Sequence, residues 1–278
     1  MATGVTAQEI LAHPRFAEAR AAHVDAVVAL FKADPLALRM MADAGIIILR
    51  GFIVGFHFAF DPEDRATWGT PGNIRGRLVE RGLASPRHVD DLLARFRHAG
   101  YVEAAPAPGD RRIVILTPTA RVIAHDRRHL AAYHRFLLAL YPGRGYEWAL
   151  TQDEDIHRRI RLSGLRDLPR ALSVLGHEAL RLFLGRDAGY LALLLVIQAN
   201  LSGRDDLTWT SMSNDLGVAR SHLRTLFSEA ERAGYVDLHG GRGGPVAILP
   251  PLWAAYDRFL AEIEADQDTI AQAAFART

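Results

Sequence analysis

The chain has 278 residues, which is enough for one or two domains of ordinary size. Its 33 basic and 32 acidic residues leave a formal net charge of +1, so composition neither indicates nor excludes a nucleic-acid partner. The absence of cysteine excludes disulfides, thiolate metal ligands, cysteine nucleophiles and thiol-based redox switches.

The N-terminal segment has no pattern typical of a signal peptide, so we expect a cytoplasmic protein. The most apolar stretch, Ala44–Phe60, is 17 residues long and contains Arg50 and His57. A membrane-spanning helix needs about 20 apolar residues, so this stretch predicts a buried helix and no membrane partner.

Signals of helix periodicity, capping and strand alternation divide the first half of the chain. Ser85 followed by Pro86 is typical of a helix start, because serine caps the first turn and proline fits its backbone. In chain order we expect helices over Phe16–Phe31, Ala44–Phe60, Asn73–Arg81 and from Ser85 to Gly100, strands over Tyr101–Ala105 and Arg112–Leu116, and a helix over Thr119–Tyr141.

The second half begins after a break at Pro142–Gly145. A capping box at Thr151–Glu154 opens a helix through about Leu162, which Ser163 and Gly164 are expected to end. Further on we expect helices over Leu165–Leu184, Asp187–Leu201, Thr210–Leu216 and Ala219–Gly234, strands over Tyr235–His239 and Val246–Leu249 around a Gly240–Gly244 loop, and a helix from Trp253 to about Phe275.

The two halves repeat each other. Ala99–Glu103 recurs as Ala233–Asp237 at an offset of 134, and upstream Thr67–Trp68 recurs as Thr208–Trp209 at an offset of 141. The anchors keep their order, and the difference of seven residues corresponds to a short insertion in the first copy. The pattern indicates a tandem duplication.

Each copy consists of a short helix, a tight turn, a second helix and a two-stranded ribbon, the parts of a winged helix-turn-helix. The major groove of B-DNA admits one such second helix, and the wing reaches the neighbouring backbone or minor groove. The first copy resembles the MarR family of bacterial transcription regulators. The resemblance lies in the second helix at Ser85–Phe96, the exit at Ala99–Val102 and the wing at Gly109–Thr117.

The resemblance implies a mainly α fold with small β-wings, in which two winged helix-turn-helix lobes share a helical core like the family's dimer interface. The chain would then be a monomer that acts as a single-chain pseudo-dimer. We expect a first unit over 1–141, a linker with a short helix over 142–163 and a second unit over 164–278. The core helices would be Phe16–Phe31, Thr119–Tyr141, Leu165–Leu184 and Trp253–Phe275.

The implied function is sequence-specific binding of double-stranded promoter or operator DNA by a transcription regulator, more in keeping with a repressor, on an asymmetric site. By the resemblance, Arg112 would enter the minor groove with Asp110 as its support. The residues expected to contact or orient DNA are Arg75, Arg77, Ser85, Arg87, His88, Asp110, Arg111 and Arg112 in the first copy and Arg220, Ser221, His222, Arg224 and Arg242 in the second.

Some residues depart from the family pattern. The second wing, His239–Pro245, has Arg242 as its one basic residue, and Pro250–Pro251 replaces the Leu-Thr of the first copy. Asp90 and Asp91 place two carboxylates in a helix that should face phosphates, where they could accept from cytosine or weaken binding. The alternative is therefore a degenerate winged-helix module that binds protein and no longer reads DNA.

Other chemistry is less well supported. His125 and His129 have the spacing of metal ligands, but an arginine-rich helix favours a solvated face, and we assign no metal or cofactor. No constellation of catalytic residues is present, so we expect no enzyme.

The aromatic run at Phe52, Phe56, Phe58 and Phe60 with His57 lies where a small aromatic or lipophilic effector could bind between core and lobe, or it packs a core. The acidic residues of the last helix, Glu262, Glu264, Asp266 and Asp268, are expected to form a face opposite the basic one.

Overall fold

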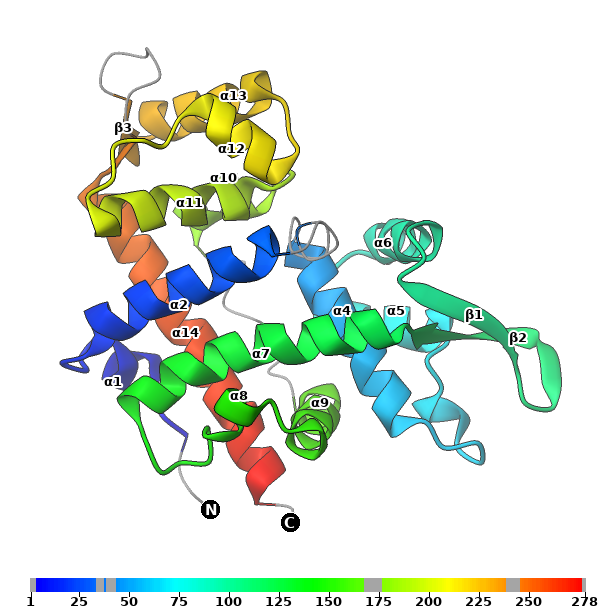
Figure 1. The fold of residues 1–278 in the computed structure, drawn as a ribbon. Coiled ribbons are helices and arrows are strands. Elements are labelled where there is room, and N and C mark those ends of the chain that lie inside the picture. The colour runs from blue at the N-terminus through cyan, green and yellow to red at the C-terminus, as the bar shows by residue number, and fades with distance from the viewer. Residues whose placement is uncertain (1–3, 34–37, 39–43, 168–176, 239–245, 277–278) are drawn as a thin grey trace.

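The computed structural model describes residues 4–33, 38, 44–167, 177–238 and 246–276, and these are mainly helical (Figure 1). Four strands in this described part of the chain form two separate antiparallel ribbons. The expectation of a mainly α protein with small β elements is confirmed. Within the described residues, no helix is long and apolar enough to cross a membrane.

The first half begins with two helices and continues into a helical and stranded lobe. Its elements are α1 (Ala7–Leu11), α2 (Phe16–Lys32), α4 (Ala44–Ala59), the 3₁₀ turn η1 (Arg65–Thr67), α5 (Pro71–Glu80), α6 (Pro86–His98), β1 (Val102–Ala107), β2 (Asp110–Pro118) and α7 (Ala120–Leu140). We call residues 44–118, from α4 to β2, lobe one.

The second half repeats the order of helix, short helix, second helix, ribbon and long helix. Its elements are α8 (Trp148–Thr151), α9 (Glu154–Asp167), α10 (Glu178–Leu184), α11 (Gly189–Ser202), α12 (Trp209–Leu216), α13 (Arg220–Arg232), β3 (Val236–Asp237), β4 (Ala247–Ile248) and α14 (Pro250–Phe275). We call residues 189–248, from α11 to β4, lobe two, of which 239–245 lie outside the described residues.

The structure locates the seven extra residues of the first copy. Relative to the repeated tryptophans Trp68 and Trp209, α5 begins three residues later than α12, it is two residues longer, and the turn after it is two residues longer. From there to the repeated Ala-Gly-Tyr sequence, α6 and α13 have the same length. The insertion therefore changes the first short helix and its approach, and leaves the second helix intact.

The sequence explains why α6 forms where it does. The Ser85 side chain accepts a hydrogen bond from the backbone N–H of His88 at 3.3 Å, and Pro86 occupies the first turn. Apolar residues at helical spacing are buried on one face, namely Val89, Leu92, Leu93 and Phe96. The opposite face is left to charged side chains.

The two ribbons differ in length. In lobe one the pairing runs from Val102 opposite Pro118 to Ala107 opposite Asp110, so both strands extend beyond the predicted ones. In lobe two only Val236 with Ile248 and Asp237 with Ala247 are paired among the described residues. The first ribbon projects away from the body of the molecule (Figure 1).

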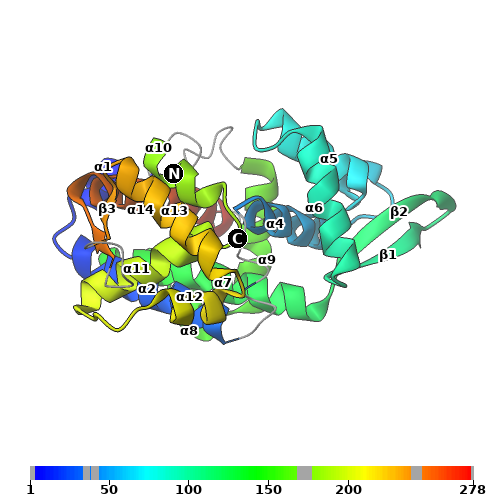
Figure 2. The ribbon, with the colours of Figure 1, turned by 90° about the horizontal axis from the view of Figure 1, so that it is seen from above.

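Each ribbon leads into a long helix, α7 after lobe one and α14 after lobe two, and we call these two helices together with α2 and α9 the centre of the molecule. Helices α7 and α14 pack against each other there, and α2 packs against α7 (Figure 1). The view from above shows lobe one on the right and lobe two on the left, where it lies over α2, α7 and α14 (Figure 2). Of the four expected core helices, those at Phe16–Phe31, Thr119–Tyr141 and Trp253–Phe275 pack together as expected. The fourth, Leu165–Leu184, is not one helix, because the backbone of His177 before α10 is extended.

Two of the helices that precede the lobes, α2 and α9, are exchanged between the halves. Helix α2 precedes lobe one in the chain but packs against α11 of lobe two, whereas α9 precedes lobe two but packs against α4 of lobe one. The units over 1–141, 142–163 and 164–278 remain a prediction. Packing crosses those boundaries, and α9 of the expected linker is a structural member of the centre.

One expected boundary is wrong. Helix α9 does not end at Ser163 and Gly164 but continues to Asp167. Ser163 is fully buried, and a Cβ added at Gly164 would lie 3.7 Å from the Ile270 side chain, so close packing against α14 outweighs the low helix propensity of these residues. Helix α10 begins at Glu178, and 168–176 of the expected Leu165–Leu184 helix lie outside the described residues.

Candidate functional sites: a basic surface and a buried pocket

The first turns of α6 present polar and basic side chains to solvent. Arg87 and His88 are exposed there, while the Ser85 hydroxyl is occupied as the cap of the helix. Arg77 of α5 is exposed on the neighbouring helix. These four predicted residues therefore lie at the α5–α6 end of lobe one.

Asp90 has a structural role that the sequence did not reveal. Arg75 Nη1 of α5 donates to both carboxylate oxygens of Asp90 on α6, each at 3.1 Å. Both side chains are about half exposed. Asp90 thus links the two helices and neutralises Arg75, whereas Asp91 is exposed to solvent.

The tip of the first ribbon carries the predicted wing arginines. Arg111 and Arg112 are exposed. The Asp110 carboxylate accepts a hydrogen bond from the backbone N–H of Arg112 at 3.1 Å, and Gly109 takes a positive φ of 76° that a tight turn needs. Asp110 therefore orders the backbone from which the Arg112 guanidinium extends.

Lobe two presents a related but different helix start. Arg220, Ser221 and Arg224 of α13 are exposed. His222 is half-buried, and its Nε2 lies 2.9 Å from the backbone carbonyl of Asp187, which fastens α13 to the loop before α11. Arg242 of the second wing lies outside the described residues.

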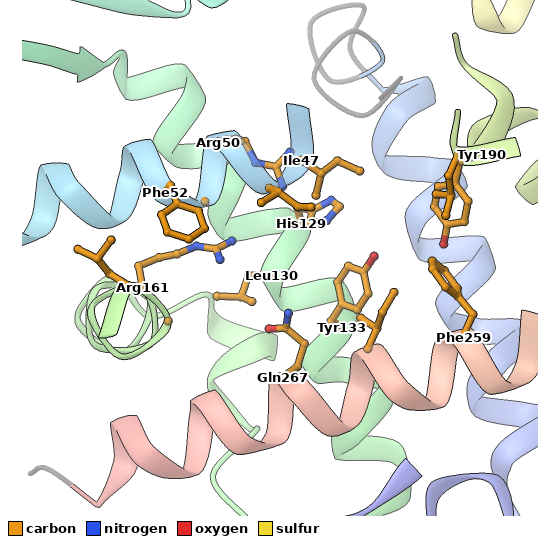
Figure 3. A pocket seen from close by; sticks show the side chains of 16 residues that line it. Ile47, Arg50, Phe52, His129, Leu130, Tyr133, Arg161, Tyr190, Phe259 and Gln267 are labelled. Atoms are coloured by element: carbon orange, nitrogen blue, oxygen red, sulfur yellow. The ribbon is translucent and has the colours of Figure 1, made fainter. Parts of the chain in front are cut away.

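A pocket of about 150 Å³ lies where lobe one meets the centre of the molecule (Figure 3). It is lined from α4, α7, α9 and α14, with Leu184 and Tyr190 closing it from the side of lobe two. The apolar lining includes Ile47, Ile48, Phe52, Leu165, Phe259 and Ile263, and the polar lining is Arg50, His129, Tyr133, Arg161 and Gln267.

The aromatic run of α4 contributes only Phe52 to this pocket. Phe56 is buried in the core of lobe one, and Phe58 packs edge-on against His157 with ring centroids 5.5 Å apart. Phe60 is 41% exposed beside Trp68. Most of the run is therefore packing, and the cavity is formed by residues that come from six helices, α4, α7, α9, α10, α11 and α14.

A buried ionic cluster centred on Asp126 of α7 forms one wall of this region. Arg161 of α9 binds its carboxylate with two parallel hydrogen bonds, from Nε at 2.6 Å and Nη2 at 2.8 Å. Arg50 of α4 donates from Nε at 3.0 Å, and His157 of α9 from Nε2 at 2.8 Å. Three helices are joined through one carboxylate.

The cluster keeps Asp126 ionised. Burial by itself raises the pKa of this carboxyl, but the charges of Arg161 and Arg50 and the hydrogen bond from His157 hold it well below its usual range. Arg50 is fully buried in the same place. Within the described residues, the cluster brings together two guanidinium groups and one carboxylate.

The histidines of α7 are not on a solvated face. His125 and His129 are both buried, with ring centroids 6.2 Å apart. Burial lowers the pKa of His129 well below its usual range, and the positive charge of Arg50 lowers it further, so His129 is neutral at pH 7. In the part of the chain that the structure describes, no group of three or more His, Cys, Asp and Glu side chains could hold a metal ion.

The expected acidic face of the last helix is also wrong in part. Glu264 and Asp268 of α14 are fully buried. Asp268 accepts from the Tyr146 hydroxyl and from Arg144. Burial raises the pKa of Glu264 well above its usual range and lowers that of the adjacent His23 to about 4, so this pair is neutral at pH 7.

Comparison of the chain with family models, with curated proteins and with solved structures found no match.

Proposed function

We propose that the chain is a transcription regulator that binds double-stranded DNA sequence-specifically and acts as a repressor. It would act as a single-chain pseudo-dimer, similar to a MarR-family homodimer. In this proposal lobe one and lobe two are winged helix-turn-helix units, and α6 and α13 are their recognition helices. The observation that carries the proposal is the exposure of basic and polar side chains on the first turns of both helices, Arg87 and His88 in α6 and Arg220, Ser221 and Arg224 in α13.

The chemistry of these positions suits DNA. A helix N-terminus attracts phosphate, and arginine binds phosphate or guanine with a planar pair of donors. The ribbon of lobe one adds Arg111 and Arg112 at an ordered turn, from which a guanidinium can enter a narrow minor groove. Lobe one therefore combines a helix contact with a wing contact.

The two lobes would bind half-sites of different sequence. The equivalent of Asp90, which is paired with Arg75, is the exposed Arg224 in lobe two, at the repeat offset of 134. Because the contacting side chains differ, the preferred site is asymmetric, with half-sites about one helical turn, roughly 34 Å, apart.

The pocket is the proposed site of a small effector. It is bounded by α4, which belongs to lobe one, and by α9 and α14 of the centre. A ligand held between them would change the position of lobe one relative to lobe two, and so the spacing of α6 and α13. This effector role is the regulatory part of the proposal.

The test is selection of binding sites from a random DNA library by the full chain, followed by affinity measurements. We expect an asymmetric site whose affinity falls steeply with salt. Arg112→Ala and Arg224→Ala should each weaken binding by about tenfold. Arg258→Ala, which removes an exposed arginine of α14, is the matched control and should have no effect.

A clean palindrome as the selected site would contradict the single-chain pseudo-dimer. Absence of binding at low salt would contradict DNA recognition altogether. That second result would favour the alternative, a winged-helix module that binds another protein.

A further inference from the structure

We propose that the free edge of β1, together with the last turn of α6, binds an extended acidic peptide of a partner protein. The peptide would add a third strand to the ribbon of lobe one and place its carboxylates beside Arg97 and His98. This inference goes beyond the proposed function, because it concerns a protein contact, and its test needs no DNA.

The register of the ribbon shows which backbone groups of β1 point outward. On the far side of β2, the Leu116 N–H donates to the Gly69 carbonyl at 2.9 Å, so it points away from β1. Leu116 lies opposite Ala104. In an antiparallel pair, two opposed residues direct their backbone groups either at each other or both away, so the N–H and C=O of Ala104 face outward. The same holds two residues earlier for Val102, opposite Pro118.

These outward groups of Val102 and Ala104 make no hydrogen bond within the described part of the chain. The edge ends at Pro106, which has no N–H and lies where the register of the ribbon shifts. From Val102 to Pro106 the edge is about 13 Å long, so an added strand would pair over about four residues. A short edge that ends in proline also resists open-ended pairing with other chains.

A shallow groove lies along this edge. Helix α6 packs against β1 at the base of the ribbon (Figure 1). The groove has a volume of about 480 Å³ and is lined by Ala94, Arg97 and His98 of α6 and by Val102 and Ala104 of β1. The two residues from β1 are the two whose backbone groups face outward, and the small alanine side chains leave room for those of an added strand.

The charge of the groove favours carboxylates. Arg97 and His98 are exposed and have no ion-pair partner in the described part of the chain. No described residue that lines the groove is acidic. Glu103 is exposed, but side chains alternate along a strand, so it lies on the other face of the ribbon from Ala104. An added strand directs every second side chain to α6, so the preferred peptide has acidic residues at alternate positions.

The groove is separate from the start of α6. Arg97 lies ten residues after Arg87, which is about 15 Å along the helix axis. A peptide in the groove therefore leaves the first turn of α6 accessible. On the proposed function, the partner protein would be held on the regulator while DNA is bound, and this clause alone depends on that function.

The experiment uses two fluorescein-labelled peptides that differ in charge, Glu-Val-Glu-Val-Glu and Lys-Val-Lys-Val-Lys. Anisotropy titrations with the full chain at pH 7 would measure affinity, and amide NMR signals would locate the site. We expect the glutamate peptide to bind at least about tenfold more tightly and to shift the N–H signals of Val102 and Ala104. Methylation of its backbone nitrogens should abolish binding, because an added strand needs those donors. Equal binding of the lysine peptide or of the methylated peptide would overturn the proposal.

Two arginines of α6 provide a matched pair of charge reversals. Arg97→Glu should lower affinity for the glutamate peptide by at least about tenfold. Arg95→Glu, at an exposed position of the same helix outside the groove, should change it by about twofold or less. Ala104→Pro removes an outward N–H and no bond to β2, and it should also weaken binding. An equal loss in Arg95→Glu and Arg97→Glu would show a diffuse electrostatic attraction and overturn the proposal.

A second copy of the chain is the other occupant that the edge could take. Sedimentation of the full chain without peptide should show a monomer. A dimer that Ala104→Pro dissociates would show that two β1 edges pair with each other, and it would overturn the acidic peptide.

Discussion

Lobe one and lobe two have the same order of elements but are attached to the molecule in different ways. Lobe one has a core of its own, formed by α4, α5, α6 and the long ribbon. The core of lobe two is continuous with α1, α2 and the C-terminal half of α7. One copy of the repeat has kept a separate body, and the other has merged with the centre.

The difference has a consequence for regulation. Lobe one meets the centre through the Asp126 cluster and the pocket, which are polar or hollow, whereas lobe two meets it through close apolar packing. A ligand can alter a polar and hollow junction more readily than a close-packed one. The comparison therefore predicts that lobe one is the part whose position responds to an effector.

The largest effect is expected from removing the carboxylate at the junction of lobe one. Asp126→Ala leaves the buried Arg50 without its ion-pair partner Asp126 and should destabilise the protein by about 3–5 kcal/mol. Urea unfolding would measure this. The control Asp257→Ala removes the partly exposed pair with Arg20 and should cost about 1 kcal/mol or less. Similar costs for both would contradict the role of the cluster.

Equivalent core positions test whether the lobes differ in cooperativity. Leu92 of α6 and Leu226 of α13 are both buried and are related by the repeat, so each substitution to alanine should cost about 2–5 kcal/mol. In hydrogen exchange, Leu92→Ala should lower protection mainly within lobe one. Leu226→Ala should lower it in α2 and α7 as well, because their core is shared. If both variants lost hydrogen-exchange protection over the same helices, the two lobes would not differ in cooperativity.

A substitution in the ribbon of lobe one would test whether the two lobes contribute differently to DNA binding. If the proposed function holds, Arg112→Ala should lower affinity for the selected site by about tenfold and mainly alter the preference at the half-site assigned to lobe one. Binding profiles over half-site variants would show this. A loss of preference at the other half-site would mean that the lobes are assigned in the wrong orientation.

A pH experiment probes the neutral pair in the centre. The folded-state pKa of Glu264 lies well above its unfolded value, so the native protein keeps a proton that the unfolded chain releases. The contribution of Glu264 to stability is therefore fully present at low pH and falls as pH rises above about 4.5. Glu264→Gln should show no such fall and should be more stable than wild type at pH 8, by on the order of 1 kcal/mol. Unfolding free energies between pH 4 and pH 8 would test it, and parallel curves would contradict it.

The smallest effect concerns the surface pair of lobe one. Asp90→Ala frees Arg75 and should cost at most about 1 kcal/mol in stability, because the pair is half exposed. With one negative charge fewer beside the recognition surface, DNA affinity should rise a few-fold at low salt. Anisotropy titrations would measure the change. A fall in affinity would indicate that Asp90 itself contacts a base.

Much of the local structure could be predicted from the residues. The capping signal of Ser85 and Pro86 predicted the start of α6. The repeated motifs and the helix periodicity predicted the repeated order of elements. The end of α9 was missed, because Ser163 and Gly164 are poor helix formers that tertiary packing holds in the helix. The candidate DNA-contacting side chains could be chosen from the sequence, because that choice depends only on where the helices and ribbon strands begin and end.

The pocket and the charges that line it could not be predicted from the sequence. Arg50 was visible as a charge in the most apolar stretch, and Asp126 as an acid between two histidines, but they are 76 residues apart. Local signals report on neighbours within a few turns, so they determined the order, boundaries and repeat of the elements. The exchange of α2 and α9, the fusion of lobe two with the centre and the meeting of Arg50, Asp126 and Arg161 depend on long-range packing. Only the tertiary structure decided them.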